Sequence, residues 1–271
     1  MRELKTTLDI QEIVIEVGGL PVRLRAANSA FLRSLEKRYA GFVSRTEHAE
    51  FEFDIDLTPP GPIGSDDDLH VLQRAGRWSA VRGDFRAEWN PISNRGSIRH
   101  FASPYSVDAV LRIVHTLALS RRGGFLVHAA SAVRNGAAFL FAGASGAGKT
   151  TLARLAPENA VLLSDEISYV RKREVGYFAF GTPFTGELAK VGENICAPIA
   201  ALYILAKGLQ NRVEPVAQAE AGRALLTNIL FFAEDAELVR LVFESACEFV
   251  VRVPVYRLTF VPDASVWEFI A

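Results

Sequence analysis

The stretch Gly143-Ala144-Ser145-Gly146-Ala147-Gly148-Lys149-Thr150 matches the pattern G-x-x-x-x-G-K-[ST] at every fixed position. An apolar run at 137–142 precedes it and is typical of a buried strand, while the residues from Thr151 onward can begin a helix. In this order of strand, glycine-rich loop and helix, backbone N–H groups of the loop and of the helix N-terminus converge on phosphate oxygens. We therefore expect residues 143–151 to bind the phosphates of a nucleoside triphosphate such as ATP.

Side chains in and after this loop predict a magnesium-dependent reaction. Lys149 would reach the β- and γ-phosphates, and the hydroxyl of Thr150 would be a ligand of Mg²⁺. Asp165 follows the apolar run 161–163, so its carboxylate is expected at a strand end, where a second metal ligand is needed. Glu166 stands beside it. Because Asp165 comes only 16 positions after Lys149, we expect one short helix to connect the two segments.

The composition is that of a globular protein long enough for two domains. The chain has 271 residues, 49% hydrophobic and 23% charged, and its formal net charge of −1 argues against nucleic acid as a partner. Its two cysteines form no C-x-x-C pair, which suits a reducing compartment. The longest apolar run, 197–206, is too short to cross a bilayer, and residues 1–5 lack an apolar signal core. We expect a cytoplasmic protein without a membrane partner.

Residues 1–105 predict a smaller α+β domain whose role no motif indicates. A hairpin is expected at 13–24, followed by a helix that Asn28 caps. The run 51–57 alternates strictly, which predicts a half-buried strand. Its carboxylates are expected on a solvated face rather than in a metal cluster: Glu52, Asp54 and Asp56. Other expected features are a loop at 58–68, rich in Pro, Gly and Asp, and strands within 78–89 and at 96–101.

Residues 106–271 predict an α/β domain built around the glycine-rich loop. The helix that leads into it begins at Ser103-Pro104 and stops before Gly123-Gly124, and its apolar stripe leaves His115 off the buried face. We expect the domain boundary on or near this helix. The other expected elements are strands at 125–133, 137–142, 161–163, 200–205 and 256–260, a hairpin at 167–180, and helices at 217–232 and 235–250.

Several segments of this domain together resemble the HPr kinase/phosphorylase family, and most of all its looser relatives, the HPr-kinase-like serine kinases, some of which modify peptides. The matching segments are Val127-His128-Ala129-Ala130, 143–151, Leu163-Ser164-Asp165-Glu166, 181–187, 194–199 and 254–258. Over about 123–271, the resemblance implies an HPr-kinase-like (phosphoenolpyruvate-carboxykinase-like) P-loop fold. It also implies ATP- and Mg²⁺-dependent phosphorylation of serine.

The resemblance implies roles for the matched residues. His128 would lie near the terminal phosphate, although a single histidine on a strand would otherwise be interpreted as structural. Asp165 would take the proton from the acceptor hydroxyl and lie close to Mg²⁺. Glu166 occupies the place of a second Asp. With Lys149, these residues form the expected catalytic set.

The sequence departs from the HPr-modifying enzymes after the acidic strand. Their glycine-rich signature is missing there, and 181–187 stands in its place. This departure removes the support for HPr as the substrate, for phosphorolysis and for a hexamer. Glu187 and Lys190, in and just after this segment, are further candidate contacts to metal, substrate or phosphate.

We therefore expect a kinase that transfers phosphate from ATP to a hydroxyl, most simply Ser of a peptide or protein, in a chain that can be oligomeric. A small-molecule kinase, a phosphatase or phosphorylase, and a non-catalytic ATP-binding module with residues 1–110 as its docking surface are the alternatives. The joint presence of His128, Lys149, Thr150 and Asp165 favours catalysis, because nucleotide binding alone needs fewer of them.

Overall fold

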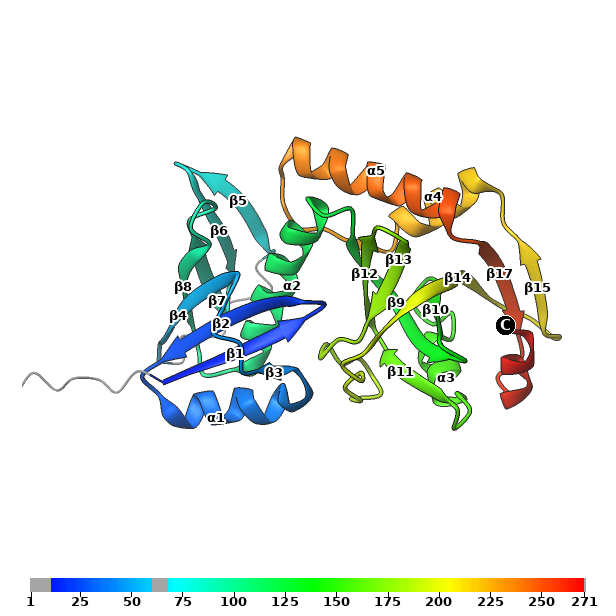
Figure 1. Cartoon of the computed structure of the whole chain (residues 1–271), viewed down its shortest axis with the longest axis horizontal. Helices are drawn as coiled ribbons and strands as arrows, with labels where there is room; N and C mark the ends of the chain where they lie inside the picture. The colour runs from blue at the N-terminus through cyan, green and yellow to red at the C-terminus, as the bar shows by residue number, and fades with distance from the viewer. Residues whose placement is uncertain (1–10, 60–67, 271) are drawn as a thin grey trace, which may run out of the picture. The chain divides into compact units, whose positions relative to one another are not determined.

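The computed structural model describes residues 11–59 and 68–270; most of the expected loop at 58–68, and the segment 1–5, lie outside the described residues. The chain divides into two compact units, residues 1–111 and 112–271. The division falls within helix α2 (Pro104–Ser120), and the boundary between 105 and 106 that the sequence suggests lies in the first turn of the same helix. Each unit is a mixed α/β structure built on its own sheet (Figure 1).

The first unit contains eight described strands in the order β3-β1-β2-β4-β8-β7-β6-β5. Their bounds are β1 (Gln11–Val17), β2 (Leu20–Ala26), β3 (Val43–Ser44), β4 (Phe51–Leu57), β5 (His70–Arg74), β6 (Arg77–Arg82), β7 (Phe85–Trp89) and β8 (Arg95–His100). The predicted hairpin is β1–β2, which turns at Gly18 and Gly19, both with positive φ. Helix α1 (Ser29–Arg38) begins where predicted, because the Asn28 side chain accepts the N–H of Phe31.

Alternation along these strands gives the sheet one apolar face. Ile15, Phe53 and Ile98, from β1, β4 and β8, are all buried there. Trp78 and Trp89 are opposite each other in β6 and β7 and stack with ring centroids 6.2 Å apart. Each Å² of apolar surface buried on folding contributes about 25 cal/mol to stability. We therefore expect this apolar face to be the main source of stability of the unit.

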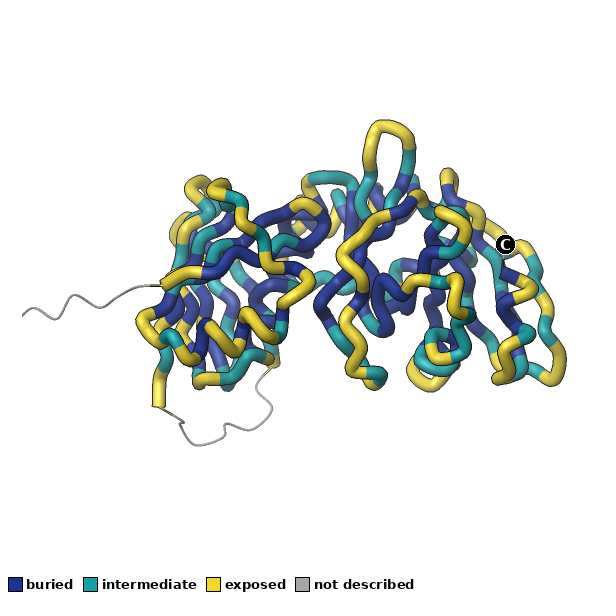
Figure 2. The backbone as a smooth tube through the Cα atoms, turned by 60° about the horizontal axis from the view of Figure 1, so that its bottom comes forward, coloured by how far each residue is buried: buried dark blue, intermediate teal, exposed yellow. Residues whose placement is uncertain are grey.

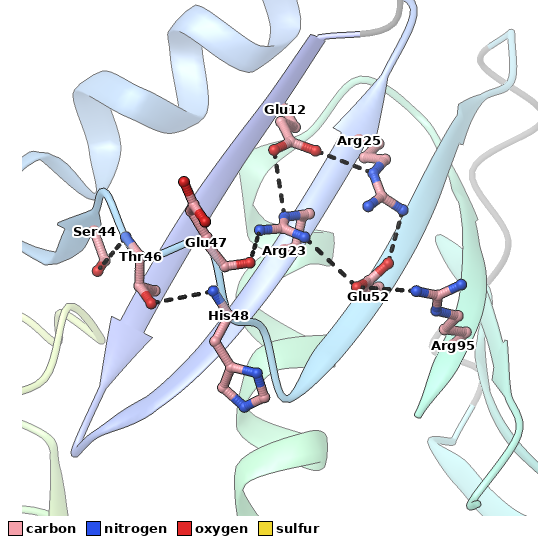
Figure 3. A network of polar contacts seen from close by, with 9 residues as sticks. All are labelled: Glu12, Arg23, Arg25, Ser44, Thr46, Glu47, His48, Glu52 and Arg95. Carbon is pink, nitrogen blue, oxygen red and sulfur yellow. Dashed lines mark hydrogen bonds and ion pairs between the residues drawn. The ribbon is translucent and has the colours of Figure 1, made fainter. Parts of the chain in front are cut away.

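The opposite face is charged, and Glu52 on it contradicts the prediction of a solvated side chain. Asp54 and Asp56 are exposed as predicted, but only 13% of the Glu52 side chain is exposed. The strand register places Arg23 of β2 and Arg95 of β8 directly opposite Glu52. Figure 3 shows Glu52 among these two arginines and Arg25. The Nη1 atom of Arg25 lies 2.9 Å from Oε2 of Glu52. The alternation in the sequence predicts the face of the sheet on which Glu52 lies, but it does not predict the arginines of the neighbouring strands.

Helix α2 corrects a second prediction. It starts at Pro104 and ends at Ser120, before Gly123 in the left-handed region, as expected. His115, however, is completely buried, with its ring edge-on to those of Tyr169 and Phe184 at centroid distances of 5.4 and 6.4 Å. Its neighbours Ile113, Val114 and Thr116 are buried as well. Around His115 the helix is therefore covered on every side. The single apolar stripe in the sequence does not indicate this.

The second unit contains nine described strands. Their order is β10-β9-β12-β13-β14-β17-β15, with β11 and β16 pairing with β9 and with β10 also pairing with β14. The bounds are β9 (Phe125–Arg134), β10 (Ala137–Ala142), β11 (Ala160–Ser164), β12 (Ile167–Arg173), β13 (Gly176–Phe180), β14 (Cys196–Lys207), β15 (Arg212–Pro215), β16 (Ile229–Leu230) and β17 (Val255–Phe260). Strands β10, β14 and β17 are parallel neighbours. The predicted turn between β9 and β10 is confirmed, with Asn135 and Gly136 both at positive φ.

Helices cover both sides of this sheet. The helical elements are α3 (Lys149–Arg154), α4 (Gln218–Leu226), α5 (Ala236–Arg252) and the 3₁₀ segment η2 (Ala264–Phe269). Leu225 of α4 and Phe249 of α5 belong to one apolar cluster, and Leu152 of α3 and Trp267 of η2 belong to another. Strands are accordingly buried over most of their length, and many turns are exposed (Figure 2).

The helix expected at 217–232 is shorter than predicted. It ends at Leu226, where the side-chain amide of Asn228 donates to the carbonyl of Ala224 at 2.7 Å. The chain then forms β16, which pairs with β9, so a pairing with a distant strand overrides the local helical pattern. Strand β15 and segment η2 were not predicted. In the described part of the chain, no helix is both long and apolar enough to span a membrane.

Candidate functional site

The glycine-rich loop 143–148 connects β10 to α3, as the sequence predicts. Gly146 and Gly148 have φ of 74° and 107°, conformations that side chains rarely adopt. At Gly148 a Cβ atom would also lie 2.6 Å from Cζ of Phe260. The loop is tightened by a hydrogen bond from the N–H of Ala147 to the carbonyl of Ala144, at 3.0 Å. Glycine is therefore required here by the backbone conformation and by the approach of Phe260.

Lys149 is the first residue of α3 and is buried. Its ammonium donates to the carbonyls of Gly143 and Ala144, at 2.7 and 3.3 Å, so the side chain is folded onto the loop. Burial lowers the pKa of Lys149, while the negative charges of Glu166 and Glu187 act in the opposite direction. The ammonium of Lys149 is thus held against the loop backbone, and the charges of two carboxylates of the same pocket act on it.

A pocket of about 360 Å³ brings most of the predicted site residues together. Of the predicted residues it is lined by His128, Ser145, Gly146, Gly148, Lys149, Thr150, Thr151, Asp165, Glu166 and Glu187. Gly186, from the same segment after β13 as Glu187, completes the lining. Gly143, Ala144 and Ala147 belong to the loop but are not part of the lining, and Lys190 is exposed outside it.

His128 lies on β9 at the pocket wall. Its backbone N–H donates to the carbonyl of Asn228 at 2.7 Å, which fixes its place beside β16. Burial lowers the pKa of His128, and the positive charges of Lys149 and Arg112 lower it further. Its imidazole is therefore favoured in the neutral form.

Asp165 follows β11 and anchors the segment 181–190. It is only 3% exposed, and its two carboxylate oxygens accept the N–H groups of Gly186 and Leu188, at 2.9 and 3.0 Å. The beginning of the segment is fixed by Thr182, whose N–H donates to the carbonyl of Leu163 at 3.0 Å. Phe184, next along, is buried. The acid predicted at the strand end thus also determines where this segment lies.

Glu187 lies beside the first turn of α3. The Thr150 hydroxyl is within 3.4 Å of its Oε2. These oxygens and Asp165 line the same pocket, although the described residues contain no cluster of three or more His, Cys, Asp or Glu side chains arranged to hold a metal ion.

Arg112, on α2, is a residue of this region that the sequence reasoning missed. Its Nη2 lies 3.5 Å from Oε2 of Glu166, and its guanidinium lies over the ring of Phe184, 5.1 Å from the centroid. No local pattern identifies it, because α2 and the end of β11 are far apart in the chain.

Comparison with known protein families finds a match. The family model described as SynChlorMet cassette protein ScmC matches residues 104–271, which include every residue of the pocket. None of the curated proteins matches the chain.

Proposed function

The chain belongs to the family of the SynChlorMet cassette protein ScmC, and we propose that it is an ATP- and Mg²⁺-dependent kinase that phosphorylates a hydroxyl, with Ser of a peptide or protein as the acceptor. One observation carries this proposal. The glycine-rich loop, with Lys149 and Thr150, faces the acidic pair Asp165-Glu166 and His128 across a single pocket. These are the parts that phosphoryl transfer requires: a phosphate cradle, a cation, metal ligands and a base.

The residues of the loop would bind and orient ATP. The first N–H groups of α3 lack partners within the helix, and those of a glycine-rich loop can turn toward phosphate oxygens. Lys149 would leave the carbonyls of Gly143 and Ala144 to neutralise the β- and γ-phosphates. His128, favoured as a neutral imidazole, would lie near the terminal phosphate without adding charge. A carboxylate of the pair Asp165-Glu166 would take the acceptor's proton.

The oxygen-rich part of the pocket fits Mg²⁺. Thr150 and Asp165 are the ligands that we propose, and Glu187 adds a carboxylate 3.4 Å from the Thr150 hydroxyl. Mg²⁺ prefers such hard oxygen ligands and commonly takes only one or two carboxylates, with water and phosphates completing its coordination. When bound, it would neutralise charge on the phosphates.

The proposal extends to the fold, the setting and the partners. We propose that residues 112–271 have the HPr-kinase-like P-loop fold, which the sequence resemblance and the parallel neighbours β10, β14 and β17 support. The family description speaks of a cassette protein, so peptides encoded by neighbouring genes are the first acceptors to examine. We place the reaction in the cytoplasm, where ATP is supplied.

The proposal is tested by incubating the purified chain with γ-labelled ATP, Mg²⁺ and peptides encoded by neighbouring genes. Label should appear on a peptide serine and disappear in Lys149→Ala and Asp165→Asn. Lys207→Ala, an exposed lysine at the end of β14, is the matched control and should transfer label normally. Binding of ATP without transfer to any acceptor would instead support the non-catalytic module.

A further inference from the structure

The two adjacent acids of the pocket have different surroundings. Asp165 is 3% exposed, and each of its oxygens already accepts a backbone N–H, from Gly186 and from Leu188. The segment 181–190 is pressed against this acid: a Cβ on Gly186 would lie 3.2 Å from Oδ2 of Asp165 and 2.8 Å from Cβ of Glu166. The contacts of Asp165 are therefore those of a group that fixes the backbone.

Glu166 is placed differently. About a third of its side chain, 32%, is exposed, and it lines the pocket together with Lys149 and Thr150. A group that takes a proton from a bound acceptor must reach the pocket with its carboxylate, and of the adjacent pair Glu166 is the one with an accessible side chain.

Arg112 is the cation paired with Glu166. Its guanidinium rests on the face of Phe184, which is itself 1% exposed, so the position of the cation is fixed by packing. From there Nη2 lies 3.5 Å from Oε2 of Glu166, while Nε is buried without a hydrogen-bond partner among the described residues. This contact joins the partly exposed carboxylate to a cation whose position is fixed by packing, and it therefore constrains where the Glu166 carboxylate lies.

We propose that Glu166 is the catalytic base of the kinase, that Arg112 is the positioning residue that orients it, and that Asp165 holds the segment 181–190 in place. This inference rests on the proposed function. As the acceptor oxygen forms its bond to the γ-phosphorus, its proton passes to the Glu166 carboxylate. The bond from that phosphorus to the β,γ-bridging oxygen breaks, and ADP leaves with the electron pair. Glu166 then releases the proton to water.

Glu187 is the remaining carboxylate of the pocket, and its position argues against the same role. Its Oε2 lies 3.4 Å from the hydroxyl of Thr150, so it would serve with Thr150 in holding Mg²⁺. In this assignment Thr150, Asp165 and Glu187 would hold Mg²⁺, and Glu166, oriented by Arg112, would face the acceptor.

The test compares the full-length chain with E166Q, D165N, R112Q and R112K in three measurements: ATP binding, transfer of label from γ-labelled ATP to neighbouring-gene peptides and to water, and amide hydrogen exchange. We expect E166Q to bind ATP normally and to lose about 100-fold in turnover, as removal of a general base does.

R112Q should lose about tenfold in turnover with little change in KM for ATP, the size expected for a supporting partner. R112K should recover part of this loss, because the ammonium keeps the charge. R121Q, at an exposed position just after α2, is the matched control.

Amide hydrogen exchange distinguishes the role of Asp165 from that of Glu166. In D165N the amides of Gly186 and Leu188 should exchange faster, whereas in E166Q they should stay as protected as in the wild-type chain. Undiminished turnover in E166Q, or unchanged protection of both amides in D165N, would overturn the assignment. A wild-type chain that binds no ATP, or that binds ATP but transfers label neither to peptide nor to water, would overturn the proposed function itself.

Discussion

The carboxylate of Glu187 lies 3.4 Å from the hydroxyl of Thr150, although the two residues are 37 positions apart in the chain. Thr150 is held by the first turn of α3, and Glu187 is held between Gly186 and Leu188, whose N–H groups both donate to Asp165. Three separate segments therefore converge to place two oxygen ligands where we propose the metal.

Replacing Glu187 by Gln should weaken the response of the chain to Mg²⁺, because a neutral amide is a poorer ligand than a carboxylate. We expect the Mg²⁺ concentration needed for half-maximal ATP binding to rise about tenfold, which corresponds to about 1.4 kcal/mol. Titration of ATP binding at increasing Mg²⁺ measures this. Glu193→Gln, at an exposed position after the same segment, is the control. An unchanged Mg²⁺ requirement in Glu187→Gln would remove Glu187 from the metal site.

Two glycines give a matched pair of stability predictions. Gly148→Ala places a side chain at a φ of 107° and 2.6 Å from Cζ of Phe260, so we expect a loss of about 1–3 kcal/mol and of ATP binding. Gly222 lies within α4, and a Cβ there meets nothing within 4 Å. Gly222→Ala should gain up to about 1 kcal/mol from helix propensity. Denaturant unfolding measures both, and a Gly148→Ala chain as stable as the wild type would show that the loop can relax.

Features formed by neighbouring residues could be predicted from the sequence. The β9–β10 hairpin follows from Asn135-Gly136, and the start of α1 follows from Asn28, because each signal acts within a few residues of the chain. The order of β10, loop and α3 is predictable for the same reason. The spacing of Lys149 and Asp165 also indicates that one short helix joins them, and α3 is that helix.

Contacts between distant segments could not be predicted in this way. Arg112 meets Glu166 because α2 passes the end of β11, and Asp165 meets Gly186 because the segment after β13 folds back over it. Hydrophobic periodicity predicts which face of a helix or strand is apolar, but it does not predict which element packs against that face. The burial of His115 escapes prediction for this reason.

Asp108 should be one of the most sensitive positions of the first unit. It is 5% exposed and accepts hydrogen bonds from Arg38, whose Nε is 3.2 Å from Oδ1, and from the hydroxyl of buried Tyr39. The bond to Asp108 is the main reason that the pKa of Arg38 is raised. Asp108→Asn leaves that cation without its counter-charge, and we expect a loss of about 3–5 kcal/mol in the free energy of unfolding.

The control for this prediction is Asp56→Asn. Asp56 has a side chain 67% exposed and pairs with Arg99 at 3.4 Å, so its replacement should cost less than about 1 kcal/mol. Chemical denaturation of the two variants side by side measures the difference. Equal stability of the two variants would mean that solvent compensates Arg38 when Asp108 is neutral.

His115 should make the stability of the chain depend on pH. Its ring is completely buried, and neither ring nitrogen has a hydrogen-bond partner among the described residues. Burial, with a smaller effect of the positive charge of Arg122, lowers its pKa from 6.5 to about 3. Between these values the unfolded chain binds the proton and the folded chain does not. The free energy of unfolding contributed by His115 therefore rises with pH from about 3 to 6.5 and is constant above that.

His115→Leu should remove this contribution. For a proton bound only by the unfolded chain, lowering the pH from 7 to 5 costs about 2 kcal/mol, so the variant should lose about 2 kcal/mol less than the wild type. At pH 8 the variant should be at least as stable, because leucine buries no unpaired ring nitrogen. Denaturant unfolding at pH 5 and pH 8 measures both values, with His48→Leu as the exposed control. If His115→Leu lost as much stability as the wild type on acidification, the buried imidazole would have to be protonated with little penalty, and the cause of any acid sensitivity would lie elsewhere.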